Sequence, residues 1–427
     1  MKEEAQLQEL VDAGLISGTQ AEDIRQYWAS KPSYGSQRLL VVFSLLGALL
    51  VGLGIILVVA HNWDDLGRLT KTTFAFIPML LGQAAVWYTL KRKPDSAAWR
   101  EGSGVFLLLA VGACLAMVSQ IYHLDGELHE FLLTWLWLAL PIMYVVNSNL
   151  ASLFFIAGAT WYATDVAYSY PGATPWLYWL FMLLALPYYL RLRNQRPGSN
   201  AQVFHDWFWP VSLLICLGTF SNDLPAYMWL AYHLFLIASY ILGKYLLQQQ
   251  KRILSNGWLV VGLLGTIGML LMQSFRDLWI EIPESWTNTM FLEQEFVLFI
   301  LLQLLLLGML LLLYRKQDLD WLRNPLCYLG IFIFAYYGLG WSDDVLGAVA
   351  ANLLLLGIGI YHILLGTKRD HLGIVNFGLL IVTLQIVCRF FDTDLSFAVR
   401  GLLFLLLGAG FFAANSYLIR QRKQREI

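Results

Sequence analysis

The sequence predicts an all-α integral membrane protein of about 14 transmembrane helices (about 12–16), N-in/C-in, with a small N-terminal cytoplasmic helical hairpin. Of the 427 residues, 58% are hydrophobic and only 13% are charged, and the mean hydropathy is +0.60. A soluble domain carries about 25% charged residues, so water alone cannot be the solvent of this chain. The remaining charges lie between long apolar runs, as a lipid environment requires.

The order of the charged and apolar segments predicts three parts. Residues 1–38 form the cytoplasmic helical hairpin, residues 39–419 form the transmembrane helical domain, and residues 420–427 form a basic cytoplasmic tail. A hairpin this small buries little apolar surface by itself. We therefore expect residues 1–38 either to cap the membrane domain or to bind a protein partner.

The hairpin is predicted from two short amphipathic patterns. Leu7, Leu10 and Val11 share one face of the first helix, and Gly14 follows as its C-cap. The segment Thr19-Gln-Ala-Glu22 has the spacing of a capping box and is expected to open the second helix.

Fourteen apolar runs follow the hairpin. They cover residues 39–60, 72–90, 104–122, 131–146, 150–168, 176–190, 208–220, 226–247, 258–275, 296–314, 325–340, 345–365, 372–390 and 401–419. A span needs about 20 residues, and the fourth, sixth, seventh and eleventh runs are shorter than that. These four either extend through aromatic residues at their ends or are re-entrant.

The loop charges predict the orientation. If both termini are cytoplasmic, the outer loops hold only Arg68, Lys71, Arg276, Arg389 and Arg400, and every other lysine and arginine faces the cytoplasm. The cytoplasmic clusters are then 91–93, 191–196, 251–252, 315–316, 368–369 and 420–425. This bias is typical of a multi-pass protein of the bacterial cytoplasmic (inner) membrane.

Tryptophans at the ends of the runs agree with this arrangement. An amphipathic ring suits the headgroup layer, and we expect that position for Trp63, Trp176, Trp207, Trp258, Trp279, Trp321 and Trp341.

Polar side chains inside the runs are costly and need partners. They are Gln83, Gln120, His233, Gln273, Gln303, Asn352, His362, Asn376, Gln385 and Asn415. For most of them, a hydrogen bond between helices is the favoured interpretation.

Three polar segments follow the first, third and thirteenth runs, all on the predicted outer side. Together they make a candidate functional site, the outer-face polar cluster: His61, Asn62, Trp63, Asp64, Lys71, Gln120, His123, Asp125, His129, Arg389 and Asp392. Imidazole and carboxylate groups can bind a divalent metal, and His61, His123 and His129 would be its ligands. Their spacing matches no metal motif, however, so we expect a polar pocket or an Arg389–Asp392 pair and no metal.

Other chemical signatures are absent from the sequence. The cysteines Cys114, Cys216, Cys327 and Cys388 stand singly in apolar runs, which favours packing over a disulfide or a metal site. There is no Walker loop, GxSxG or HExxH motif. The net charge of −1 gives no basic field for nucleic acid. We expect no cofactor, the lipid bilayer as partner, and no common enzyme chemistry.

Several short motifs resemble a known family. They are Gly14-Leu-Ile-Ser17, Gly47–Gly54 leading into Ala60-His-Asn-Trp-Asp64, Gln120-Ile-Tyr-His123, and Arg389-Phe-Phe-Asp392. The chain is similar at these places to the bacterial membrane proteins named domain of unknown function 2157, over residues 1–150 and the last 60. The resemblance implies a multi-spanning bacterial inner-membrane protein and supplies no activity.

Three functions remain open from the sequence. A small-solute transporter or channel is favoured by the number of spans and the buried amides. A membrane-embedded assembly or sensing component would use residues 1–38 as its cytoplasmic contact. A membrane enzyme would use the outer-face polar cluster.

Overall fold

The computed structural model describes residues 7, 10–30, 66–170, 173–220, 225–247, 253–281 and 294–390, and isolated residues between 396 and 412. All regular secondary structure in this part of the chain is helical. The chain forms two compact units, residues 1–74 and 75–427. The predicted first run, the basic tail and all but isolated residues of the last run lie outside the described residues.

The first unit contains the predicted hairpin turn. Gly14 has φ +71°, and the N–H groups of Gly14 and Leu15 donate to the carbonyls of Val11 and Leu10. These bonds satisfy carbonyls at the end of the first helix. Leu7 is buried, whereas Leu10, predicted on the same face, is 40% exposed.

The second hairpin helix, α2 (Gly18–Ser30), begins earlier than the sequence predicts. Its capping box joins Ser17 and Gln20: the Gln20 N–H donates to Ser17 Oγ (3.2 Å), and the Ser17 N–H donates to Gln20 Oε1 (2.9 Å). The predicted box at Thr19 and Glu22 is therefore wrong. Both pairs have the same spacing, and the pair that directly follows the turn makes the cap.

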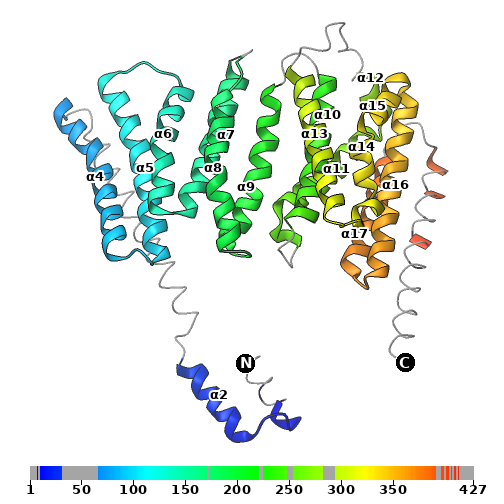
Figure 1. Ribbon diagram of the computed structural model, residues 1–427, viewed down its shortest axis with the longest axis horizontal. Helices are drawn as coiled ribbons and strands as arrows, with labels where there is room; N and C mark the ends of the chain where they lie inside the picture. Colours follow the sequence, from blue (N-terminus) through cyan, green and yellow to red (C-terminus); the bar gives the residue numbers. More distant parts are fainter. Residues whose placement is uncertain are drawn as a thin grey trace. The chain divides into compact units, whose positions relative to one another are not determined.

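A series of helices continues the chain (Figure 1). They are α4 (Arg68–Arg92), α5 (Ala97–Tyr122), α6 (Leu128–Val146), α7 (Asn149–Ser169), α8 (Trp176–Gln195), α9 (Asn200–Leu217), α10 (Pro225–Ile241), α11 (Gly257–Gln273), α12 (Arg276–Glu281), α13 (Gln294–Arg315), α14 (Pro325–Ile331), α15 (Ile333–Ser342), α16 (Asp344–Lys368) and α17 (Leu372–Phe390). A π-helical turn, Leu242–Leu246, extends α10, and a 3-10 turn, Gly218–Phe220, extends α9.

Eight helical segments of the described residues are long and apolar enough to cross a membrane. They are α4, α5, α6, α7, α9 with its 3-10 turn, α13, α16 and α17. The pair α14 and α15 would be a ninth, but it is bent by 71° between Ile331 and Ile333. The predicted fourteen spans therefore stay a prediction. Of the four short runs, the fourth and seventh extend into helices of sufficient length, and the eleventh is this bent pair.

The other predicted runs in the described part fall on α8, α10 and α11, which are not among the eight. Helix α10 has 17 residues and is buried almost all round, from Leu230 to Ile241. A helix that is apolar on every side belongs in the interior of a bundle. Protein, instead of lipid, surrounds most of α10.

Hydrogen bonds show that the basic segments of the second unit share one end of its helices. Glu101 at the start of α5 accepts from Asn149 at the start of α7, which accepts from Tyr188 near the end of α8. Arg193 of α8 donates to Leu247 after α10, and a cavity joins Lys244 to Lys368 at the end of α16. We name this the basic end. Glu127, Asp165, Arg276 and Asp344 lie at the opposite end, where they pair with neighbouring segments.

The core of the second unit has two main parts. The first bundle, α4–α9, packs around residues such as Leu136 and Phe181, and the second bundle, α10–α17, packs around residues such as Leu306 and Tyr337. Helix α11 joins them, since it packs against both α9 and α10. At this junction a Cβ on Gly257 would overlap the backbone of Asp206, so only glycine permits the approach.

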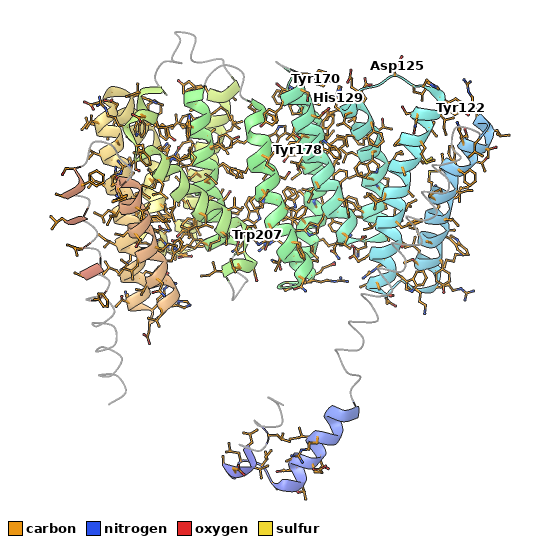
Figure 2. The ribbon with its side chains drawn as sticks, turned by 180° about the vertical axis from the view of Figure 1, so that it is seen from behind. Tyr122, Asp125, His129, Tyr170, Tyr178 and Trp207 are labelled. Atoms are coloured by element: carbon orange, nitrogen blue, oxygen red, sulfur yellow. The ribbon has the colours of Figure 1, made fainter. Side chains whose placement is uncertain are left out.

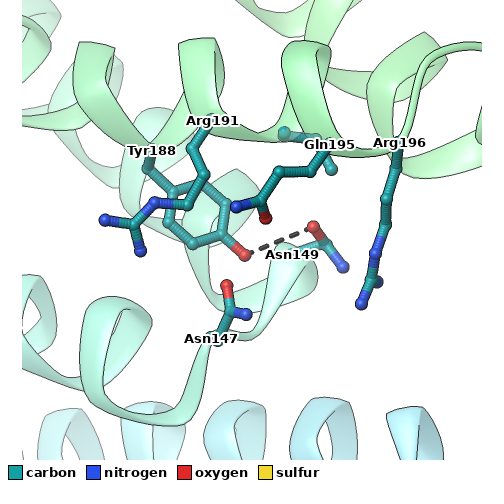
Figure 3. A pocket seen from close by; sticks show the side chains of 7 residues that line it. Asn147, Asn149, Tyr188, Arg191, Gln195 and Arg196 are labelled. Carbon is teal, nitrogen blue, oxygen red and sulfur yellow. Dashed lines mark hydrogen bonds between the residues drawn. The ribbon is translucent and has the colours of Figure 1, made fainter.

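The carboxylate of Glu101 fixes the turn between α6 and α7. It accepts hydrogen bonds from Ser148 Oγ (2.6 Å), Asn149 Nδ2 (2.6 Å) and the N–H groups of Asn149 (3.0 Å) and Leu150 (2.9 Å). Tyr188 holds the same turn by donating to Asn149 Oδ1 (3.2 Å; Figure 3). One half-buried carboxylate thus satisfies free N–H groups at the start of α7.

Replacing Glu101 by glutamine should lower the free energy of unfolding by about 1–3 kcal/mol, because an NH₂ group would face donors that need an acceptor. Thermal unfolding in a mild detergent measures the effect. Asp95→Asn, an exposed carboxylate in the preceding loop, is the matched control. Equal stability of the two variants would contradict the role given to Glu101.

A buried ion pair closes the basic end of the first bundle. Arg193 Nη1 lies 2.6 Å from Asp206 Oδ1, and the two side chains are 5% and 2% exposed. Tyr189 also donates to Asp206 Oδ1, and Gln202 donates to Asp206 Oδ2. The sequence placed Arg193 in a cytoplasmic cluster with Arg191 and Arg196, and of the three only Arg193 is buried.

Candidate functional site

Four members of the outer-face polar cluster lie where α5 meets α6. Gln120 and His123 are at the end of α5, Asp125 is in the connection, and His129 is in the first turn of α6 (Figure 2). Gln120, His123 and Asp125 are exposed. His123 has φ 51° and ends α5 by donating its N–H to the Ser119 carbonyl. It therefore acts as a helix C-cap.

The side chain of His129 contacts Asp165 and Tyr170. Its Nδ1 lies 3.7 Å from Asp165 Oδ2 of α7, and its ring contacts that of Tyr170. Tyr170 donates to Glu127 (2.7 Å), and this hydrogen bond to a carboxylate raises the pKa of Tyr170 to about 12. The sequence did not select Glu127, Asp165 or Tyr170 as partners of His129.

Arg389 lies against other helices. Its Nη2 donates to Ser274 Oγ (3.0 Å) after α11, and its guanidinium lies 4.4 Å from the centre of the Phe275 ring. These contacts join α17 to the end of α11, whereas those of His129 join α6 to α7 and Tyr170. Lys71 lies in the first turn of α4.

The remaining members, His61, Asn62, Trp63, Asp64 and Asp392, lie outside the described residues. The proposed ligand set of His61, His123 and His129 therefore includes a residue that the structure does not describe. In the described ranges, no three His, Cys, Asp or Glu side chains are grouped to hold a metal ion.

A second polar region surrounds the bend between α14 and α15. Gln303, near the middle of α13, donates its Nε2 to the carbonyl of Gly330 (3.2 Å), two residues before the bend at Phe332. A Cβ on Gly330 would overlap Leu306 of α13, so glycine allows the two helices to approach here. A side chain that hydrogen-bonds the backbone beside a broken helix is how such breaks are tolerated in a membrane.

A buried polar cluster follows the bend. Gln273 Nε2 donates to Tyr337 Oη (2.5 Å), and Tyr336 Oη donates to Gln273 Oε1 (2.9 Å). Tyr337 donates to the carbonyl of Trp229 (3.1 Å), and its Oη lies 3.4 Å from His233 Nδ1. These side chains come from α10, α11 and α15, so the cluster joins the bent pair to the centre of the second bundle.

The cluster and its surroundings leave two polar atoms unsatisfied. His233 Nε2 and Gln303 Oε1 are buried and have no hydrogen-bond partner among the described residues. Leaving a buried polar atom unpaired costs about 1–3 kcal/mol. We call His233, Gln273, Gln303, Tyr336 and Tyr337 the bend cluster and take it as the candidate functional site.

The sequence anticipated part of the bend cluster. His233, Gln273 and Gln303 were flagged as polar residues inside apolar runs, and hydrogen bonds between helices are confirmed for both glutamines. The same interpretation is confirmed for Gln385, which donates to Asn352 Oδ1 (3.1 Å). Tyr336 and Tyr337 were missed, because tyrosines in an apolar run resemble ordinary packing or interfacial residues.

Comparison with known families gives one match. Residues 8–152 match the family described as predicted membrane protein (DUF2157). The resemblance to this family is therefore confirmed for the first third of the chain. The match ends within α7 and does not include Arg389 or Asp392. The comparison with curated proteins found no match, and neither did the comparison with solved structures.

The family description and the helices agree on a coarse identity. The chain is a predicted membrane protein with several membrane-spanning helices, and the lipid bilayer is its surrounding partner. The bend cluster lies beyond the segment that resembles DUF2157, so nothing about it is carried over from that family.

Proposed function

We propose that this protein transports a small solute across the membrane, and that the second bundle provides the path. The observation that supports the proposal is a broken helix beside a half-satisfied polar cluster. Many transporters place their substrate site where a discontinuous helix crosses the middle of the bilayer. Here the bend at Phe332 lies beside Gln303, and His233 lies near the middle of α10.

The unsatisfied atoms favour transport over packing alone. Hydrogen-bonded amides between helices are common and need no further role. Leaving His233 Nε2 and Gln303 Oε1 unpaired is costly. Other buried atoms of the second bundle, such as Ser239 Oγ and Gln385 Oε1, also lack a partner among the described residues, but His233 Nε2 and Gln303 Oε1 are the two that belong to the bend cluster. A solute, or a second arrangement of α14 and α15, would supply the partners that these atoms lack.

Movement of α14 can be tested with a cysteine that the chain already carries. Cys327 lies on α14, before the bend, and Cys216 lies on α9 in the first bundle; both are fully buried. If α14 moves during transport, a variant that keeps only Cys327 should react with N-ethylmaleimide in membranes at least about tenfold faster than one that keeps only Cys216. A tenfold difference in labelling rate corresponds to a free energy of opening that is about 1.4 kcal/mol lower around Cys327.

Both single-cysteine variants carry alanine at the other three cysteine positions, so they differ only in the site that reports. Labelling is followed by mass spectrometry before and after denaturation in detergent. Denatured samples of both variants should label equally. A Cys327 that reacts no faster than Cys216 in the folded protein would count against a mobile α14 and against the proposed path.

The orientation is part of the same proposal. We propose that the basic end faces the cytoplasm and that about fourteen spans leave both termini on that side of a bacterial inner membrane. Reporter domains fused after Lys93 and after Glu130 should then report opposite sides, with Lys93 cytoplasmic, because α5 runs between them. A cytoplasmic signal from the fusion after Glu130 would refute this orientation.

A further inference from the structure

The basic end of the second bundle contains a cavity of about 480 Å³. It lies between the π-helical turn after α10, the connection from α13 to α14, and the last turns of α16. Its volume is within the range of about 300–1,000 Å³ that small-molecule sites occupy. The transport function proposed above rests on the bend cluster and does not depend on this cavity.

The charges that line the cavity are unbalanced. Four cationic side chains face two carboxylates: Lys244, Arg323, Lys368 and Arg369 against Asp318 and Asp320. The ion pairs found among the described residues join other side chains, and none neutralises these four cations within 4.0 Å. The cavity therefore presents a net positive charge, and its two carboxylates lie beyond ion-pair distance of its cations.

Lys244 is held in place by tyrosines. Its Nζ donates to Tyr240 Oη (2.7 Å) and lies 5.1, 5.1 and 5.7 Å from the ring centres of Tyr240, Tyr245 and Tyr361. Asn324 Nδ2 donates to the hydroxyls of Tyr240 and Tyr245, both at 3.0 Å. Rings can hold an ammonium group in position without neutralising it.

We propose that this cavity binds the phosphate group of an anionic ligand. Guanidinium and ammonium groups are the side chains that recognise phosphate, the first through paired hydrogen bonds and the second as a point charge. Leu364 and Leu365 give the cavity an apolar wall. Basic pockets between transmembrane helices bind phospholipid headgroups, and a free phosphate ion offers the same chemistry.

The experiment measures the melting temperature of the purified full chain in neutral detergent. One arm adds phosphatidylglycerol, a second adds inorganic phosphate, and phosphatidylcholine serves as the zwitterionic control lipid. A ligand that binds only the folded protein raises its melting temperature as its concentration rises. We expect a rise of at least about 2 °C with phosphatidylglycerol or with phosphate, and none with phosphatidylcholine.

Charge-matched variants separate the cavity from general attraction. Lys368→Ala with Arg369→Ala removes two exposed cations of the cavity, and Arg315→Ala with Lys316→Ala removes two exposed cations at the same end that do not line it. The first pair should abolish the rise, and the second should keep it. Asp320→Asn removes a repelling carboxylate and should lower the ligand concentration for half the effect severalfold.

Each outcome decides the proposal. A rise with the lipid alone identifies a phospholipid headgroup, and a rise with phosphate alone identifies a free anion; loss of either rise in the Lys368 and Arg369 variant supports the cavity. The proposal is overturned if neither ligand raises the melting temperature. It is also overturned if both double variants lose the rise equally, since the cavity would then contribute nothing specific.

Discussion

Asp206→Ala should lower the free energy of unfolding by about 3–5 kcal/mol, since it leaves a buried guanidinium without its counter-ion. The side chain of Arg193 is 5% exposed. Among the described ion pairs, Asp206 is its only carboxylate partner. The substitution also removes the acceptor of Tyr189 and of Gln202. The effect should appear as a large fall in melting temperature in detergent.

Two further variants show that the loss comes from the unpaired charge. Arg191→Ala, which removes an exposed cation two residues earlier on α8, should change stability by no more than about 0.5 kcal/mol. Arg193→Met combined with Asp206→Leu removes both charges and should recover most of the stability, because neither partner is left buried alone. If Asp206→Ala is as mild as Arg191→Ala, the ion pair does not stabilise the bundle.

The same pair shows where prediction from the sequence ends. Arg191, Arg193 and Arg196 are equivalent to any rule that counts loop charges. What distinguishes Arg193 is Asp206, 13 residues later on α9, which the turn between α8 and α9 brings within 2.6 Å. Such a pairing depends on the three-dimensional packing of two helices, and no local pattern encodes it.

Helices in lipid-length apolar runs were the most predictable part of the fold. The run predicted at 372–390 has the bounds of α17, and the run at 345–365 lies within α16. Long apolar stretches are specified by composition, because an unpaired backbone cannot lie in lipid. The bend in the eleventh run was less predictable, because the residue at the bend is Phe332 and not a proline or a glycine.

The candidate site was predictable only in part, for a similar reason. A buried His233 or Gln303 stands out because it is polar in an apolar run. Its partners do not stand out, because Tyr337 gains its role from the helices that surround it, and a carbonyl such as that of Gly330 has no sequence signature. The outer-face polar cluster stays a prediction: His123 and Asp125 are polar and exposed at a helix end, and five of its other members lie outside the described residues.

Trp279→Ala should cost about 3–5 kcal/mol of unfolding free energy, since it empties the space of a completely buried indole. The sequence placed Trp279 in the headgroup layer, whereas its side chain is 0% exposed and packs against protein between Gly340 of α15 and Gly347 of α16. Its Nε1 donates to the carbonyl of Gln273 (2.7 Å). The indole therefore links α12 to the backbone of the bend cluster. Trp161→Ala, at a tryptophan that is 55% exposed, should change stability by no more than about 0.5 kcal/mol.

Gly340 tests the packing from the other side of the ring. A Cβ at this position would overlap the indole of Trp279, so Gly340→Ala should destabilise by about 1–3 kcal/mol in the natural chain. In the Trp279→Ala background the same methyl group enters empty space and should cost much less. The two changes should therefore fail to add, as expected for residues in direct contact. If the losses of unfolding free energy in the two single variants add up to the loss in the double variant, Gly340 is required for its backbone conformation and not for its contact with the indole of Trp279.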